Sequence, residues 1–318
     1  MPIKIRLTLL LLLLTTLGFS QKQKASFTVV PLGVKGGIDE KNLSAYLVAP
    51  FGTTDFIALD AGTINAGIEK AIEKNTFTAA VETVLKQYIK GYFISHAHLD
   101  HVSGLIINSP ADAAKTVYAS QSCMQMMEDH YFNGDTWANF GDAGSGYQIK
   151  KYHFQTLKMA EKTIISNTTM TVQAFPLSHV NPFESTAFLI QNKEDYVLYL
   201  GDTGADRIEK SNKLSALWQT IAPLIKEKKL KGIFIEVSFP NEQPENQLYG
   251  HLTPKLLNEE LEALSTFTGK EALKSLNIIV THVKPPTEKI TKLKQQLDEY
   301  NPFQVHLIYP EQGVQLEL

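Results

Sequence analysis

The sequence predicts an α/β protein built from two facing mixed β-sheets with helices packed outside them. Three observations carry this prediction. Short apolar and β-branched runs are followed by helical patterns, and this succession occurs twice along the chain. The 318 residues are 43% hydrophobic, which is enough for one large core. There is no internal repeat and no Pro- or Ser-rich linker, so a single domain is the simplest organisation.

In the first half of the chain, runs typical of strands come before helical patterns. The strands are expected at 26–34, 44–49, 55–59 and 90–95. The helices are expected at 65–74 and 79–90. This half therefore supplies the first sheet and part of its helical cover.

The second half repeats the succession. Its strands are expected at 169–175, 185–191, 196–200, 232–237 and 278–281. Its helices are expected at 213–226, 254–264 and 288–299. The segment 124–147 behaves differently, because it is rich in Met and aromatic residues and ends in a glycine run typical of a flexible loop. Its aromatic side chains either pack in the core or form a lid over a planar ligand.

The first twenty residues are typical of a secretory signal peptide. Lys4 and Arg6 precede a leucine run, and small residues follow at Gly18 and Ser20. The apolar part is well short of the roughly 20 residues that span a bilayer. We therefore expect residues 1–20 to be removed, leaving a single domain at 21–318 that is periplasmic or secreted and has no stable membrane anchor. An uncleaved N-terminal anchor is the alternative.

Charge and cysteine content exclude further classes. The formal net charge is −3, and loss of Lys4 and Arg6 makes the mature chain more acidic, which disfavours nucleic acid as a partner. The single cysteine, Cys123, excludes an intrachain disulfide, so stability has to come from the core and any bound metal. The oligomeric state stays open, with a homodimer as one alternative.

Four candidate metal ligands occupy six positions directly after the strand expected at 90–95: His96, His98, Asp100 and His101. Imidazole and carboxylate together suit zinc and other first-row ions. His96 and His98, two apart in an extended chain, can point the same way. Asp100 and His101 follow once the chain has begun to turn. The spacing therefore predicts two adjacent metal ions rather than one.

Three later residues share the same context, a strand end followed by a polar residue. They are His179, Asp202 and His282. Asp202 lies between Gly201 and Gly204, and a carboxylate can bridge two ions, so we expect it to be the bridging ligand. A single strand-end Asp is more commonly a turn cap, and it is the combination with the first cluster that favours a metal site.

The segment 96–110 resembles, position for position, the signature of class II 3′,5′-cyclic-nucleotide phosphodiesterases, which have the metallo-β-lactamase fold. Its tail, Ile106-Ile107 followed by Ser109-Pro110, separates that signature from the wider superfamily. Further similar segments lie at 42–48, 59–63, 236–239 and 250–254. The resemblance implies a metallo-β-lactamase-like αββα sandwich and hydrolysis of cAMP, cGMP or both.

The resemblance also implies how the seven ligands divide between two divalent ions. One ion takes His96, His98, His179 and Asp202. The other takes Asp100, His101, Asp202 and His282. We expect zinc, with manganese or another first-row ion as the alternative.

The candidate catalytic residues are His251, Asp100 and Glu236. Water activated by the two ions is expected to attack phosphorus and open the ring to a 5′-monophosphate. His251 precedes Thr253-Pro254, which is typical of a helix start, and is expected to protonate the leaving 3′ oxygen while Glu236 fixes its tautomer. A purely structural contact of His251 with loop backbone is the alternative. Asp60 is expected to fix the loops beneath the metals.

Two other functions remain to be weighed. One is a hydrolase with the same metals that acts on a lactone, a β-lactam or another phosphodiester, including RNA. The acidic balance and the export signal disfavour RNA, and the tail of the signature disfavours a lactone or lactam. The other is a catalytically silent nucleotide-binding protein, which the complete ligand set disfavours. Nothing in the sequence distinguishes adenine from guanine.

Overall fold

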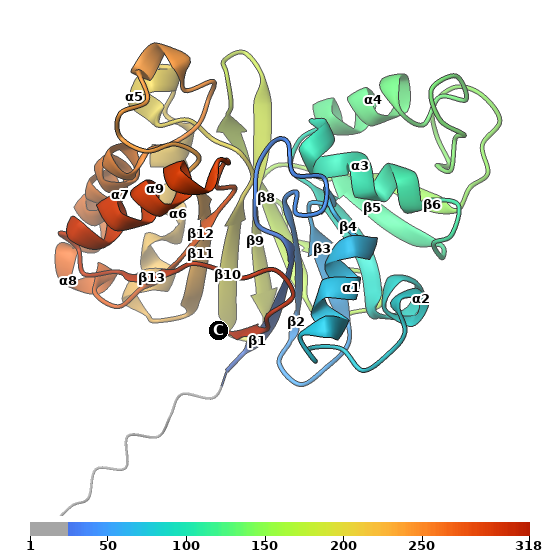
Figure 1. Ribbon diagram of the computed structural model, residues 1–318, viewed down its shortest axis with the longest axis horizontal. Coiled ribbons are helices and arrows are strands. Elements are labelled where there is room, and N and C mark those ends of the chain that lie inside the picture. The colour runs from blue at the N-terminus through green and yellow to red at the C-terminus, as the bar shows by residue number, and fades with distance from the viewer. Residues whose placement is uncertain (1–24) are drawn as a thin grey trace, which may run out of the picture.

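The computed structural model describes residues 25–318, so the signal peptide expected at 1–20 lies outside the described residues. Two seven-stranded mixed sheets pack face to face, and helices cover the outer face of each (Figure 1). This confirms the α/β architecture expected from the sequence. Within residues 25–318, no helix is both long and apolar enough to cross a membrane.

The first sheet has the strand order β14-β1-β2-β3-β4-β5-β6. Its strands are β1 (Phe27–Gly33), β2 (Ala45–Pro50), β3 (Phe56–Leu59), β4 (Ile89–Ile94), β5 (Lys115–Ala119), β6 (Tyr152–Thr156) and β14 (Leu316–Glu317). Its helices are α1 (Asn65–Glu73), α2 (Val81–Thr83), the π-helical turn η1 (Val84–Tyr88), α3 (Leu99–Asn108) and α4 (Gln121–His130). All of these helices lie on one side of the molecule in Figure 1.

The second sheet has the strand order β13-β12-β11-β10-β9-β8-β7. Its strands are β7 (Thr163–Ile164), β8 (Thr171–Ser178), β9 (Glu184–Asn192), β10 (Asp195–Leu200), β11 (Leu230–Glu236), β12 (Asn277–Thr281) and β13 (His306–Ile308). Its helices are α5 (Asp206–Glu209), α6 (Lys213–Lys226), the 3₁₀ turn η2 (Glu245–Gln247), α7 (Pro254–Thr268), α8 (Lys270–Leu273) and α9 (Thr287–Glu299).

Successive side chains of a strand point to opposite faces of its sheet, so each strand contributes both to the packing between the sheets and to the packing against the outer helices. In β4, Tyr92 and Ile94 pack against the helices of the first sheet, whereas Phe93 points between the sheets. There Phe93 stacks on Tyr118, with ring centroids 4.4 Å apart, and meets Phe188 of the second sheet edge to face. Strands buried on both faces must be apolar throughout, as the sequence of these strands is.

Strand direction brings the polar strand ends to one side. β4 runs parallel to β3 and β5, and β10, β11 and β12 run parallel to one another. β8 is antiparallel to β9, which is antiparallel to β10, so β8 and β10 run in the same direction. The carboxyl ends of β4, β8, β10, β11 and β12 are all followed or occupied by polar residues, and these residues form the site described below.

The expected helix at 79–90 is wrong in its last two residues. The helical conformation ends at Tyr88, and Ile89 already pairs with Phe56 of β3, so the strand takes the last residues of the pattern. In the segment 124–147, α4 extends to His130, ahead of the glycine run that was expected to be a loop. Ser120 caps this helix by accepting a hydrogen bond from the backbone N–H of Cys123, at 3.3 Å.

Candidate metal centre

Every expected ligand lies directly beyond a strand or in the first turn of a helix. His96 and His98 follow β4, and Asp100 and His101 begin α3. The remaining ligands follow strands of the second sheet, His179 after β8, Asp202 after β10 and His282 after β12. The structure thus brings all seven residues together at the seam between the two sheets.

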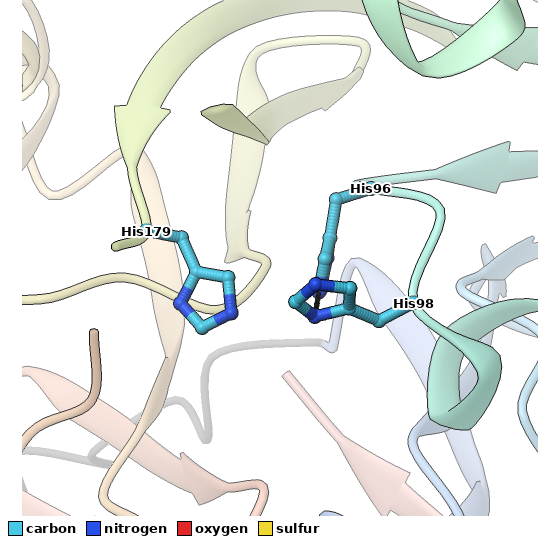
Figure 2. A group of neighbouring side chains, drawn as sticks. All are labelled: His96, His98 and His179. Atoms are coloured by element: carbon cyan, nitrogen blue, oxygen red, sulfur yellow. Dashed lines mark hydrogen bonds between the residues drawn. The ribbon is translucent and has the colours of Figure 1, made fainter. Parts of the chain in front are cut away.

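The first group is the cavity trio, His96, His98 and His179 (Figure 2). Nε2 of His96 lies 3.0 Å from Nδ1 of His98, and the His179 ring faces both, with centroids 5.1 Å away. His96 and His179 are buried, whereas His98 is exposed. Burial lowers the pKa of both buried histidines below the ordinary value and so favours neutral imidazole, the form that binds metals.

The second group is the inner trio, Asp100, His101 and His282. Nε2 of His282 is 3.2 Å from Oδ2 of Asp100, and Nε2 of His101 is 3.9 Å from the same oxygen. Asp202 lies between the trios. Its Oδ2 is 3.2 Å from His282 Nε2 and 3.3 Å from His101 Nε2, and 3.9 Å from Nε2 of both His96 and His179. This is the position that a bridging carboxylate needs.

Hydrogen bonds on the outer side of the rings orient four of the histidines. The Nδ1 partners are the Ser95 hydroxyl for His96 (3.0 Å), Asp60 for His101 (2.7 Å), the Gly250 carbonyl for His179 (2.9 Å) and the Ser238 hydroxyl for His282 (3.0 Å). The hydroxyl of Ser95 donates to Asp60 and that of Ser238 to Glu236, so each is left to accept from a ring N–H. In all four rings Nδ1 therefore carries a proton, and Nε2 points inward as the atom available to a metal.

The inward-facing atoms fit bound cations. Nε2 of His101 is buried and has no hydrogen-bond partner among the described residues. It lies 3.3 Å from Oδ2 of Asp202, and although burial disfavours a charged ring, the carboxylates of Asp202 and Asp60 raise the pKa of His101 well above its ordinary value. Positive charge between these atoms is therefore favourable, and nitrogen and oxygen donors together suit a first-row divalent ion.

Asp60 organises the base of this centre. Its carboxylate is fully buried and accepts hydrogen bonds from His101 Nδ1 (2.7 Å), Ser95 N (2.7 Å), Ser95 Oγ (2.8 Å) and the Tyr199 hydroxyl (2.6 Å). Tyr199 belongs to the second sheet, so Asp60 joins the two sheets beneath the ligands. This is the supporting role expected from the sequence.

Two glycines permit the close packing of ligands. A Cβ atom on Gly36 would lie 2.1 Å from the His282 ring, and one on Gly250 would lie 2.7 Å from Nδ1 of His179. Gly250 also has φ +75°, a conformation that favours glycine. Any larger residue at either position would push a ligand ring out of place.

His251 lies at the edge of the centre, between the side chains of Glu236 and Lys284. Its Nδ1 is 2.7 Å from Oε1 of Glu236, and its Nε2 is 2.8 Å from Nζ of Lys284. An ammonium group can only donate, so Nε2 accepts and the ring proton is on Nδ1, pointing at Glu236. Burial lowers the pKa of His251 to about 4, and burial together with Asp202 raises the pKa of Glu236 to about 7.

A cavity of about 380 Å³ opens beside the cavity trio. It is lined largely by apolar side chains of α4 and of the turn between β8 and β9, including Met126, Tyr131, Pro182 and Phe183. Of the aromatic residues of segment 124–147, Phe132 and Phe140 are buried in the core, while Tyr131 lines the cavity and donates a hydrogen bond to the Ala97 carbonyl at 2.8 Å. Core packing thus holds for Phe132 and Phe140, whereas a lid over a ligand stays a prediction for Tyr131.

Three residues of the site could not be predicted from the sequence. Ser238, Lys284 and Met126 reach the site through contacts with residues far away in the chain, and no local pattern marks them. The expected cap at Thr253 is present, since its hydroxyl accepts from Leu256 N at 3.3 Å. It places His251 just before α7, as the sequence predicts.

Comparison with known proteins gives a consistent result. Residues 24–312 match the family model of class-II cAMP phosphodiesterases. A 3′,5′-cyclic-nucleotide phosphodiesterase of Aliivibrio fischeri is 41% identical over 99% of both chains, and a probable one of Yersinia pestis is 38% identical over 93% of this chain and 90% of the relative.

Two solved structures share the fold. The crystal structure of unliganded yeast PDE1 matches with a TM-score of 0.82 at 24% identity, covering 92% of this chain and 100% of that one. The metallo-β-lactamase fold protein YhfI of Bacillus subtilis matches with a TM-score of 0.60 at 13% identity, covering 92% of this chain and 99% of that one.

Proposed function

The chain belongs to the class-II cAMP phosphodiesterases, and from this premise we propose how its centre performs the reaction. Its activity is the hydrolysis of 3′,5′-cyclic nucleotides, as the family match and relatives at 38–41% identity over nearly the whole chain establish. The alternative, a hydrolase acting on a lactone or another phosphodiester, is not favoured by any of these matches. The observation that carries the mechanism is the convergence of seven ligand side chains with inward-facing nitrogen and oxygen atoms.

The seven ligands would hold two divalent ions, most simply zinc. The cavity trio would hold one and the inner trio the other, and Asp202 could contribute to both. The outward hydrogen bonds of four histidines support this assignment, because they fix each ring in the tautomer that binds a metal through Nε2. When bound, the ions supply Lewis-acid stabilisation of the phosphoryl oxygens and a lowered pKa for water.

The side chains of this protein supply orientation and proton transfer. The oxygen of water forms a bond to phosphorus, and the bond between phosphorus and the 3′ oxygen breaks. Water loses one proton and the 3′ oxygen gains one, so the reaction changes no net proton count at these two atoms. Asp100, whose side chain is 20% exposed against 3% for Asp202, is the carboxylate positioned to accept a hydrogen bond from the attacking water. The carboxylates of Asp60 and Glu236 already accept hydrogen bonds from protein donors, and that of Asp202 lies between the two trios.

His251 is the proposed proton donor to the 3′ oxygen, and Glu236 holds its ring. The 2.7 Å contact between Nδ1 and Glu236 supports this division of roles. For proton transfer, Nε2 has to release Lys284 and take up a proton. An anionic substrate promotes this release because it attracts the lysine ammonium.

The cavity beside the cavity trio is the proposed site of the nucleoside. Its volume of about 380 Å³ lies in the range typical of small-molecule sites, and its apolar lining suits the faces of a purine. Tyr131 and Phe183 offer aromatic surfaces there. The phosphate then points to the metal centre.

We also propose that residues 1–20 direct export and that the mature domain acts on nucleotides outside the cytoplasm. The basic start and leucine run of the sequence support this. Fractionation of cells that produce the full chain, with N-terminal sequencing of the product, tests it. Recovery of an uncleaved chain in the cytoplasmic fraction contradicts it.

The central experiment is an assay of product identity. The mature protein, from Gln21, is incubated with 3′,5′-cAMP or cGMP, with and without EDTA, and products are separated by chromatography. We expect 5′-AMP or 5′-GMP, loss of activity with EDTA and its return with added zinc. No turnover of either nucleotide, together with hydrolysis of a lactone, contradicts the proposal.

A further inference from the structure

Lys284 is a lysine without an acidic partner. Its side chain is partly buried, yet no carboxylate lies within 4 Å of Nζ among the described residues. Its contacts are Nε2 of His251 at 2.8 Å and the ring of Phe239, 5.4 Å from Nζ to the centroid. Partial burial of a charged group is costly unless a counterion approaches it, so this position suits an anion.

The backbone fixes Lys284 beside the metal centre. Its N–H donates to the Ser238 carbonyl at 3.3 Å, and the Val283 carbonyl accepts from Gly36 N at 3.2 Å. His282, two residues earlier, belongs to the inner trio. The stem of Lys284 therefore starts from a segment that cannot move far without displacing a ligand.

No other lysine or arginine in residues 25–318 has a hydrogen bond or ion pair to a member of the centre. The other basic side chains for which contacts are found have partners away from the centre, as Lys213 does in Glu184 and Lys115 does in Asp112. Among residues 25–318, Lys284 is therefore the cation that is available to an anion arriving at the centre.

We propose that Lys284 binds a non-bridging phosphate oxygen of the cyclic nucleotide. On substrate binding its Nζ exchanges the bond to Nε2 of His251 for a charge-assisted bond to the phosphate. The exchange places the phosphate next to His251 and leaves Nε2 free to face the 3′ oxygen. This inference rests on the proposed function, and it adds a substrate-binding residue to it.

The test compares Lys284→Met, which removes the charge, with Lys284→Arg, which keeps it. Lys289→Met is the matched control, because Lys289 is exposed on α9 and changes the charge equally. The readouts are equilibrium binding of 5′-AMP and of adenosine by calorimetry, KM and kcat for cAMP, and metal content. Adenosine has the same base and sugar but no phosphate, so it reports whether the pocket itself is intact.

We expect Lys284→Met to weaken 5′-AMP binding about 10- to 100-fold, the usual effect of losing a hydrogen bond to a charged group, and to raise KM. Adenosine binding and metal content stay unchanged, Lys284→Arg recovers part of the affinity, and Lys289→Met matches the parent protein.

A Lys284→Met protein with lower kcat but unchanged 5′-AMP affinity overturns the inference, because the lysine then acts only by positioning His251. Equal weakening of 5′-AMP and adenosine overturns it as well. A parent protein that hydrolyses no cyclic nucleotide instead overturns the proposed function, and the two failures are therefore distinguishable.

Discussion

The cavity trio and the inner trio use similar side chains in different surroundings. The cavity trio borders an open space, and His98 is exposed. The inner trio is enclosed, with His101 and His282 almost completely buried, Asp60 beneath the first and Gly36 against the second. One half of the centre thus faces the arriving substrate, while the other is held by the interior of the protein.

The inner trio is the half whose rings are held in place by buried partners. The cavity trio is the half that solvent and ligands can reach. His101 and His282 each have a buried outer partner, Asp60 and Ser238, which fixes the ring. His98 has no such partner among the described residues, since its one hydrogen-bond contact is with His96. We therefore expect the inner trio to hold its ion more tightly than the cavity trio.

The largest effect is expected from removing the residue that both trios share. Asp202→Ala deletes the carboxylate between them, so both ions are lost and turnover of cAMP falls at least about 10³-fold. Metal analysis and the kinetic assay measure this. Asp135→Ala, at an exposed position, is the control. An Asp202→Ala protein that keeps two ions and normal turnover excludes the bridging assignment.

An intermediate loss of metal affinity is expected from Asp60→Asn. This variant tests whether the two trios depend differently on Asp60. The amide cannot accept all four hydrogen bonds, so His101 loses its fixed tautomer and the inner trio loses metal affinity by about 10- to 100-fold. Titration against a chromogenic chelator should show the larger loss at the inner trio, because Asp60 contacts His101 directly and reaches His96 of the cavity trio only through Ser95.

Asp112→Asn provides the matched control for that variant. Asp112 is a buried carboxylate that accepts from Tyr92 and Tyr152, at 2.7 and 2.9 Å, away from the centre. It should lower the melting temperature and leave both metal affinities unchanged. Equal loss of metal in the two variants would mean that Asp60 acts only through general stability.

The smallest effect is expected on the open side, from Phe183→Ala. Phe183 is 55% exposed and lines the cavity, so its loss removes part of an aromatic contact with the base. We expect KM for cAMP to rise about 2- to 10-fold, with kcat and metal content unchanged. Phe51→Ala, an exposed aromatic that does not line this cavity, should leave KM as it is. A changed metal content in Phe183→Ala would mean that the residues lining the cavity also help to hold the ligand rings in place.

The sequence predicts what depends on local pattern. The helix expected at 213–226 has the same bounds in the structure, because its apolar period and flanking residues are local features. The expected strands lie within about three residues of the observed ones at each end, whereas β5 and β6 are not predicted. The candidate ligands could be predicted because strand ends and dense histidines are visible along the chain.

The rest depends on contacts between distant segments. Helix α3 begins inside the ligand cluster, and neither its start nor α4 has a strong apolar period. Ser238 and Lys284 act on His282 and His251, which are 44 and 33 residues away. Only the pairing of β11 with β12 and the turn after it bring these groups together.

The seam between the sheets has a thermodynamic consequence. Each trio takes ligands from both sheets, so a bound ion ties the two halves of the chain together in a protein whose sequence contains no pair of cysteines to do so. Ions that bind the folded chain alone add to its stability by mass action, about 2.7 kcal/mol for each ion present at one hundred times its dissociation constant. The melting temperature should therefore follow the free metal concentration of the surroundings, and metal scarcity should unfold the protein as well as inactivate it.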